Sequence, residues 1–202
     1  MRYYSEKSAK DFLKKEGFEI LKSVYIKKFE DIKVKTKNLN FPIVAKIFGK
    51  KIIHKSKIGG VKLNLKSYEE IFKVFEEMKK INGFEGVVVQ KQVKGKEIFL
   101  GLKKTHEFGY AIGFGTGGVN VEQIKDINFR IAPLSKKEIK GMINDTKISK
   151  ELSKNEKNSI EKNLILLQNL SKKYPKISEL DINPLILNKN FSKIIDARMV
   201  WK

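Results

Sequence analysis

Two apolar segments near the C-terminal end of the sequence constrain the fold most strongly. Ile182–Leu187 and Lys193–Ala197 have the composition of β-strands. The residues between them favour a turn, and they include Asn188, Lys189, Asn190 and Ser192. The sequence therefore predicts an antiparallel hairpin. A turn centred on Asn190-Phe191 places Asn183 and Asp196 diagonally on one face of this hairpin, because alternate residues of a strand share a face.

Asn183 and Asp196 form a candidate metal site on the predicted hairpin. An amide oxygen and a carboxylate on rigid strands are hard oxygen ligands, which suit Mg²⁺. The alternative is an ordinary ion pair, in which Asp196 contacts Arg198 or a nearby lysine. The spacing of these residues leaves both interpretations open.

The composition places the chain among globular proteins. It has 202 residues, of which 41% are hydrophobic, and it contains no cysteine. This is enough apolar material for a core, while disulfides, zinc thiolate sites and a cysteine nucleophile are excluded. No stretch approaches the roughly 18 apolar residues that cross a membrane, and the first residues do not resemble a signal peptide. We expect a soluble, cytoplasmic protein that does not bind membranes.

The chain carries a formal net charge of +20, but this charge comes almost entirely from lysine. Only Arg2, Arg130 and Arg198 are arginine, whereas proteins that read nucleic acids generally use arginine for bidentate contacts. The charge favours anionic ligands in general. It does not favour nucleic acid as the main partner, and a basic RNA-binding protein remains an alternative.

The order of the predicted elements indicates an α+β fold with mixed sheets. We expect two lobes, over residues 1–92 and 93–202, that meet near Gln90–Lys94. Ser149–Asn158 is polar and rich in lysine, and we expect an exposed linker there. Three predicted helices begin at the caps Ser5, Ser67 and Ser135. A fourth helix is predicted over Ile160–Tyr174. The remaining predicted strands are Ser23–Ile26, Phe41–Ile47, Val61–Leu65, Gly86–Val93, Glu97–Leu102 and Ala111–Phe114.

Two further features are compatible with phosphate chemistry. Gly115–Gly118 follows a predicted strand, where small residues expose backbone N–H groups to an anion. This loop matches neither the dinucleotide fingerprint nor the P-loop. His54 precedes a loop containing Gly59-Gly60, and without further context such a histidine is more often structural than catalytic. His106 lies in a predicted hairpin turn and receives no role.

Several of these motifs occur in an order that resembles one known family. The residues that carry the resemblance are Phe41–Lys46, His54–Ser56 with Gly59–Val61, Phe114–Gly118 with Glu122, Phe129–Leu134, Glu179–Leu185 and Asp196–Arg198. Together they are similar to the ATP-grasp β subunit of ADP-forming acetyl-CoA synthetase, within the succinyl-CoA synthetase superfamily. The resemblance covers nearly the whole chain. It implies an ATP-grasp fold, with two α/β lobes that clasp a nucleotide, and it favours Asn183 and Asp196 as ligands of Mg²⁺.

The resemblance also implies a reaction and a partner. Acyl-CoA, phosphate and ADP give the acid, CoA and ATP through an acyl phosphate formed on a CoA-binding α subunit, which is a separate chain in an expected α2β2 heterotetramer. Acyl-CoA and acyl phosphate therefore reach this chain through the partner. The family's phosphohistidine falls on His54, which would carry the phosphoryl group, and Asp181 would orient it. The succinate-specific relatives and a non-catalytic nucleotide-binding subunit remain alternatives.

The remaining site residues follow from the same resemblance. Lys46 corresponds to the lysine that contacts nucleotide phosphates, Gln90–Val93 to the adenine-binding hinge and Glu97 to the acid that binds the ribose. The expected phosphate loop contains Gly115, Gly117 and Gly118. Three departures from the family pattern concern nucleotide affinity and the subunit contact. They are Lys91 and Lys57 at positions where the family is commonly acidic, and the stretch Ser149–Asn158.

Overall fold

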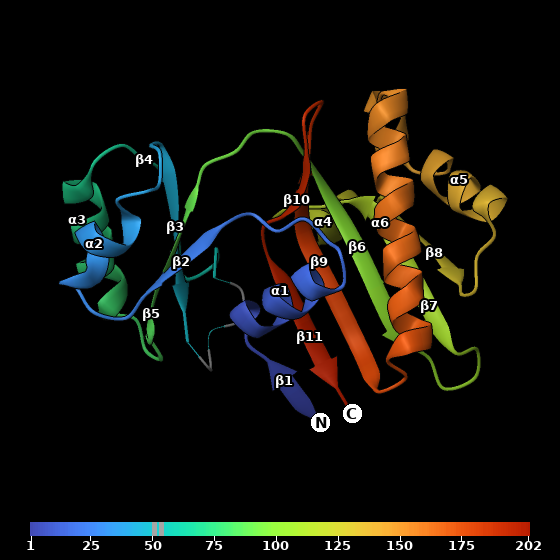
Figure 1. Cartoon of the computed structure of the whole chain (residues 1–202), viewed down its shortest axis with the longest axis horizontal. Coiled ribbons are helices and arrows are strands. Elements are labelled where there is room, and N and C mark those ends of the chain that lie inside the picture. The colour runs from blue at the N-terminus through green and yellow to red at the C-terminus, as the bar shows by residue number, and fades with distance from the viewer. Residues whose placement is uncertain (50–51, 53–54) are drawn as a thin grey trace. The chain divides into compact units, whose positions relative to one another are not determined.

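The computed structural model describes residues 1–49, 52 and 55–202. The chain forms two compact units. Unit 1 combines Met1–Ile20 with Lys94–Lys202, and unit 2 is Leu21–Val93. We describe each unit by itself (Figure 1).

Unit 1, whose residues are all described, is built on a sheet of seven strands, which we call the large sheet. The strand order is β1-β11-β9-β6-β7-β8, with β10 beside β9, and every pairing is antiparallel. The strands are β1 (Arg2–Tyr4), β6 (Lys96–Lys104), β7 (Tyr110–Thr116), β8 (Ile127–Ile131), β9 (Ile177–Leu187), β10 (Ser192–Ile194) and β11 (Ala197–Trp201).

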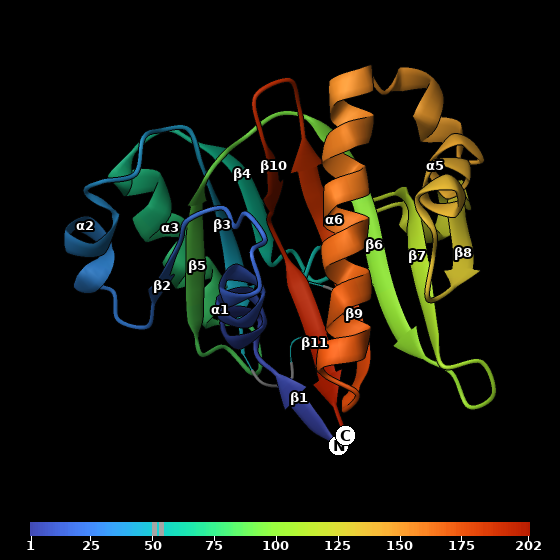
Figure 2. The same ribbon diagram turned by 45° about the vertical axis from the view of Figure 1, so that its right-hand side comes forward.

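Three helices cover one face of the large sheet, which we call the covered face. They are α1 (Glu6–Lys15), α5 (Lys136–Asn144) and α6 (Lys154–Lys173), and Figure 2 shows α6 in front of the strands. Leu13, Met142 and Leu164 of these helices share one core with Leu100 and Leu180 of the sheet. Two short elements complete the unit, namely α4 (Val121–Ile124) and the 3-10 helix η1 (Lys147–Glu151).

The predicted helix caps are present in unit 1. Ser5 accepts the backbone N–H of Ser8 at 3.2 Å and begins α1. Ser135 and Glu138 form the reciprocal capping box that begins α5. These local signals therefore mark the helix starts where the sequence predicts them.

The prediction of an exposed linker over Ser149–Asn158 is wrong. Ser153 and Glu156 form a second capping box, so α6 begins at Lys154 rather than at Ile160. Ser149, Leu152 and Glu156 are buried, which places this stretch against the core in spite of its lysines. The buried Glu156 is polar as well, and it is stabilised there by its hydrogen bonds to Lys96 and Ser153.

The observed division of the chain also differs from the expected lobes. A boundary lies between Val93 and Lys94, one residue from the predicted one, but Met1–Ile20 belongs with the C-terminal residues. The reason is that β1 pairs with β11, with Tyr3 opposite Val200, and that α1 packs on the covered face. Unit 2 is therefore inserted between two parts of unit 1.

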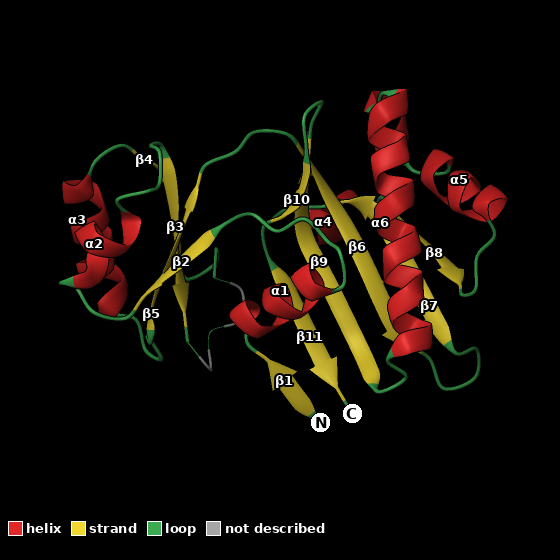
Figure 3. Ribbon diagram, in the orientation of Figure 1, coloured by secondary structure: helices red, strands yellow, loops and turns green. Residues whose placement is uncertain are grey.

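In the described part of unit 2, four strands form the small sheet in the order β2-β5-β3-β4, again antiparallel. The elements are β2 (Ser23–Ile26), α2 (Asp31–Thr36), β3 (Ile43–Phe48), β4 (Val61–Leu65), α3 (Tyr68–Lys79) and β5 (Gly86–Lys91). Helices α2 and α3 pack on one face, where Ile32 and Phe75 join Ile47 and Val89 in a second core (Figure 3). Within the described ranges, no helix is long and apolar enough to cross a membrane.

Candidate functional site

The glycine loop, Gly115–Gly118, lies at the end of β7, and its backbone donors are already bonded within unit 1. Thr116 N–H donates to the carbonyl of Asp126 at 3.0 Å, and Gly117 N–H donates to the carbonyl of Glu97 at 2.7 Å. Gly118 N–H donates to Asn183 Oδ1 at 2.7 Å. The expected way of binding phosphate, through exposed N–H groups, is therefore not available at these three residues, because the backbone pairing continues as far as Gly117 and the Asn183 side chain bonds Gly118.

The loop instead brings Glu97 and Asn183 together at Gly118. The Asn183 amide makes two hydrogen bonds to the Gly118 backbone, since its Nδ2 also donates to the Gly118 carbonyl at 3.3 Å. A Cβ atom at Gly118 would clash with the Glu97 carboxylate, and the φ of +94° is itself typical of glycine. Glu97 comes from β6 and Asn183 from β9. These two predicted site residues both lie against a third, Gly118.

Asn183 and Asp196 lie closer in register than predicted. The observed pairing of Ile182 with Ala197 and of Leu185 with Ile194 places Asn183 directly opposite Asp196, and Asn183 N–H donates to the Asp196 carbonyl at 3.2 Å. The predicted diagonal arrangement is wrong, because the turn is centred one residue earlier in the chain. The two side chains remain half-buried oxygen donors on adjoining strand segments.

Asp181 lies one pleat away from Asn183 on the second face of the large sheet, opposite the covered face. Burial, together with the charge and hydrogen bond of Glu179, raises the pKa of Asp181 to about 6, although Arg198 and Lys103 oppose the shift. These neighbours belong to β9, β11 and β6. Asp181 therefore combines partial burial with charges of both signs, an environment common at functional carboxylates.

The predicted nucleotide residues of unit 2 share one face of the small sheet. Lys46 on β3 is paired with Val88, and Gln90 on β5 is paired with Val44, so both side chains point away from α2 and α3. Lys46 is 8% exposed and Gln90 is 1% exposed, and Gln90 Nε2 donates to Ser23 Oγ at 2.9 Å. Val93 ends the unit and is half-buried. Lys91, the departure at the hinge, is exposed at the end of β5.

The histidines fall in two different situations. His54 lies outside the described residues, so its role stays a prediction. Lys57, which follows it, is exposed in a turn that closes at Gly60, whose N–H donates to the Lys55 carbonyl at 2.8 Å. His106 is exposed in the turn between β6 and β7, as predicted.

One side chain that supports the glycine loop, Asp126, is not among the residues predicted from the sequence. The buried Asp126 carboxylate accepts Thr116 Oγ1–H at 2.6 Å and the N–H groups of Lys147 and Ile148 at 2.6 and 3.0 Å. Burial alone would raise the pKa of Asp126, but these hydrogen bonds lower it below its ordinary value. An acidic residue within a lysine-rich region was the only signal in the sequence.

A pocket of about 410 Å³ lies elsewhere in unit 1. Its lining includes Glu19, Asn155, Lys162 and Ser192 but none of the predicted site residues. The contacts at Gly118 therefore identify the candidate site better than this pocket does.

Comparison with known families tests the resemblance directly. The sequence model described as an ATP-grasp domain matches residues 1–200. The chain belongs to the ATP-grasp family. This confirms the predicted fold class, and the antiparallel sheets of both units agree with it.

Curated relatives narrow the family further. The chain is 31% identical over 209 residues to the β subunit of acetate–CoA ligase [ADP-forming] I of Pyrococcus furiosus, covering 96% of this chain and 90% of that protein. It is 34% identical over 200 residues to acetate–CoA ligase [ADP-forming] II of Archaeoglobus fulgidus, covering 96% of this chain but only 30% of that protein. The chain thus groups with the β subunits and spans about three tenths of the longer Archaeoglobus protein, so the predicted family is confirmed.

A solved structure has the same fold over the whole chain. The acetyl-coenzyme A synthetase 1 of Ca. Korarchaeum cryptofilum, in complex with coenzyme A, Ca-AMPCP and HgCl⁺, has a TM-score of 0.90 and 32% identity, and the match covers 100% of this chain and 94% of that one. Another complex of that protein, with coenzyme A and Mg-AMPPCP, has its phosphohistidine segment pointing towards the nucleotide binding site. Its TM-score is 0.83.

Proposed function

We propose that this chain is the β subunit of an ADP-forming acyl-CoA synthetase, an acid–CoA ligase. The observation that carries the proposal is the joining of Glu97, Gly118 and Asn183 in unit 1, in a chain that matches the β subunits along nearly their whole length. A carboxylate, an amide oxygen and a glycine loop at one point suit the transfer of a phosphoryl group, which depends on positioning and on charge neutralisation.

The proposed reaction makes ATP from an acyl phosphate in two transfers. A ring nitrogen of His54 takes the phosphoryl group as the bond between phosphorus and the acyl oxygen breaks and the carboxylate leaves. An oxygen of the ADP β-phosphate then takes the group from His54 as the phosphorus–nitrogen bond breaks. Two short transfers replace one long one. The half-buried Asp181 would accept a hydrogen bond from the imidazole and so orient it.

The residues present fit a nucleotide with its metal ion. Asn183 Oδ1 accepts one hydrogen bond from Gly118 and has a second lone pair, so together with the Asp196 carboxylate it supplies hard oxygen donors for Mg²⁺. When bound, Mg²⁺ neutralises phosphate charge. Lys46 would contact the phosphates, Gln90 and Val93 the adenine, and Glu97 the ribose hydroxyls. Gly115, Gly117 and Gly118 would face the phosphoryl group as a smooth, close-packed surface rather than as N–H donors.

The partner follows from the names of the matched β subunits. A separate CoA-binding α subunit would form the acyl phosphate and hold the acyl group, and the expected assembly is an α2β2 heterotetramer in the cytoplasm. The partner would then determine which acyl chain is accepted. The test therefore includes both acetyl-CoA and succinyl-CoA.

The test is reconstitution with candidate α subunits over a panel of acyl-CoAs. Incubation with Mg²⁺ and γ-labelled ATP is expected to label this chain in an acid-labile, base-stable manner. His54→Ala is expected to abolish both the label and ATP synthesis, whereas His106→Ala, in an exposed turn, keeps both.

Three outcomes contradict parts of the proposal. Normal turnover of His54→Ala with a competent partner means direct transfer to ADP. Nucleotide binding without labelling or turnover means a non-catalytic subunit. Equal ADP affinity with and without Mg²⁺, in the wild type and in Asp196→Asn and Asn183→Ala, removes the proposed metal ligands.

A further inference from the structure

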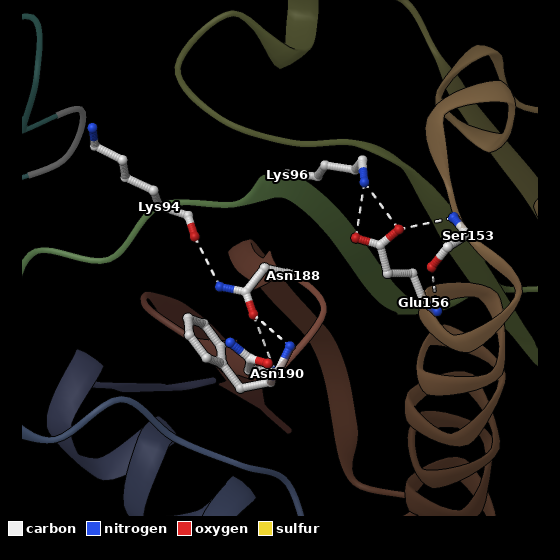
Figure 4. A network of polar contacts seen from close by, with 7 residues as sticks. Lys94, Lys96, Ser153, Glu156, Asn188 and Asn190 are labelled. Carbon is white, nitrogen blue, oxygen red and sulfur yellow. Dashed lines mark hydrogen bonds and ion pairs between the residues drawn. The ribbon is translucent and has the colours of Figure 1, made fainter.

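The first residues of β6 are held by side chains from two distant parts of unit 1 (Figure 4). Asn188, in the turn between β9 and β10, donates through Nδ2 to the Lys94 carbonyl at 3.0 Å. Its Oδ1 accepts the N–H groups of Asn190 and Phe191 at 2.9 and 3.1 Å. The turn and the start of β6 are thereby fixed to each other through one amide side chain.

The second contact is an ion pair between Lys96 and Glu156. Lys96 Nζ donates to both carboxylate oxygens of Glu156, at 2.8 and 2.9 Å, and Glu156 Oε2 also accepts the Ser153 N–H at 2.8 Å. Glu156 is only 4% exposed. Burial alone would raise its pKa, but the hydrogen bonds of Lys96 and Ser153 lower it. The Glu156 carboxylate therefore favours its charged form, and the two hydrogen bonds fix the geometry of the pair.

Close packing of the backbone makes this segment intolerant of small shifts. Gly95 separates the two held residues, and a Cβ atom there would lie 2.5 Å from the Leu187 carbonyl oxygen and 2.7 Å from Ile186 Cγ2. Residues 94–96 are thus located by an amide, a close backbone contact and an ion pair in succession. Any movement of Lys96 passes to the next residue, which is Glu97.

Glu97 points the other way from Lys96, because successive side chains of a strand lie on opposite faces. Lys96 reaches α6 on the covered face, whereas the Glu97 carboxylate lies against Gly118. The Glu97 carbonyl also accepts the Gly117 N–H. The ion pair therefore fixes the backbone of β6 next to Glu97 and makes no contact with the site itself.

We propose that Glu156, acting through Lys96, is a positioning residue for the Glu97 carboxylate and thereby for nucleotide binding. This inference rests on the proposed function, in which Glu97 binds the ribose. A positioning role differs from a purely stabilising one in what it changes. An ion pair that only stabilises the fold would not affect the affinity of the folded protein for a nucleotide.

The experiment measures ADP affinity by titration calorimetry in Mg²⁺ with the full chain. Glu156→Gln is expected to weaken ADP binding about tenfold, a change that corresponds to about 1.4 kcal/mol. Lys96→Met, which leaves the Ser153 cap intact, is expected to weaken it similarly, and Lys96→Arg, which keeps a bidentate pair, to stay within about twofold of wild type. The matched control is Glu16→Gln, which removes the 2.9 Å ion pair with Lys173 in the same unit. We expect no change in ADP affinity from this control.

A double-mutant cycle distinguishes positioning from general destabilisation. If Glu156 acts through Glu97, Glu156→Gln has no further effect on ADP affinity in a Glu97→Gln background. Additive losses overturn the inference, as does wild-type ADP affinity in Lys96→Met or in Glu156→Gln. A wild-type chain that binds no ADP overturns the proposed function first, and so the two failures are distinguishable.

Discussion

The two faces of the large sheet are built from the same strands but from different kinds of residue. On the covered face, Leu100, Ile112 and Leu180 are at most 1% exposed and pack under α1, α5 and α6. On the second face, Gly101 and Gly113 are neighbours, and the Phe99 ring lies close to both of them. Glu179 and Asp181 continue this face along β9.

The difference shows where stability and function are separated in this fold. Apolar burial on the covered face supplies the free energy of folding. The second face keeps the Asp181 carboxylate half-buried, which raises its pKa but adds little to stability. Substitutions on the two faces should therefore affect different measurements.

The largest expected effect is on the covered face. Leu164→Ala leaves a cavity under the sheet and is expected to lower the free energy of unfolding by about 2–5 kcal/mol. Denaturant unfolding measures this loss, and the exposed Val119→Ala serves as the control. A loss below about 1 kcal/mol would mean that the core collapses around the site.

The glycine loop should be the most sensitive position next to the second face. A Cβ atom at Gly117 would lie 2.6 Å from the Ile98 carbonyl carbon and 2.9 Å from the Phe99 nitrogen, both of which are backbone atoms. We expect Gly117→Ala to destabilise the protein by about 1–3 kcal/mol and to weaken nucleotide binding. Gly141→Ala in α5 meets no atom within 4 Å and should instead stabilise the protein by up to about 1 kcal/mol. Equal melting temperatures for the two variants would contradict this contrast.

Asp126 tests whether a buried charge on the covered side contributes to stability. Thr116 faces the covered side with Ile98, its partner on β6, and Asp126 binds Thr116 to the first turn of η1. Asp126→Asn is expected to cost about 1.5 kcal/mol at neutral pH. Because the pKa of Asp126 is lower in the folded protein than in the unfolded chain, its contribution is present above the unfolded value near 3.8 and is lost as the pH falls below it. Urea titrations at pH 7 and pH 3 should show the difference between wild type and variant shrinking at the lower pH.

The smallest effect is expected at the edge of the second face. Phe129 is 59% exposed although its ring contacts the Cβ position of Gly113. We expect Phe129→Ser to change the free energy of unfolding by no more than about 0.5 kcal/mol. A loss above about 1.5 kcal/mol would show that this face contributes to the core after all.

Local signals in the sequence predicted much of this fold. The strands Ser23–Ile26 and Val61–Leu65 have their predicted bounds, and the caps Ser5 and Ser135 are confirmed. The caps depend on neighbouring residues alone, and the strands are rich in residues that favour a pleated, half-buried surface. The family and the fold class are also confirmed, because several ordered motifs specify a family better than any single one.

Some of the missed features are contacts between residues far apart in the sequence. No local pattern in Arg2–Tyr4 indicates pairing with β11, and none in Gly117 indicates that its N–H donates to Glu97. Strand β8 was missed because its pattern is reversed, with Phe129 and Ile131 exposed. The linker prediction failed for another reason, since the capping box Ser153–Glu156 was visible in the sequence but was outweighed by the lysines around it.

The pairing of β1 with β11 has a consequence for biosynthesis. Unit 2 is a continuous segment that ends at Val93, so a ribosome completes it early and it can fold as its residues emerge. Unit 1 must wait, because Arg2 finds its partner only when Trp201 has been made. The same proximity suits circular permutation, since a short linker could join these two neighbouring strands and new ends could be opened at an exposed turn such as Thr105–Gly109. Such a permutant would synthesise β11 and β1 in succession, and β6 would then be the strand that completes the large sheet, between β9 and β7.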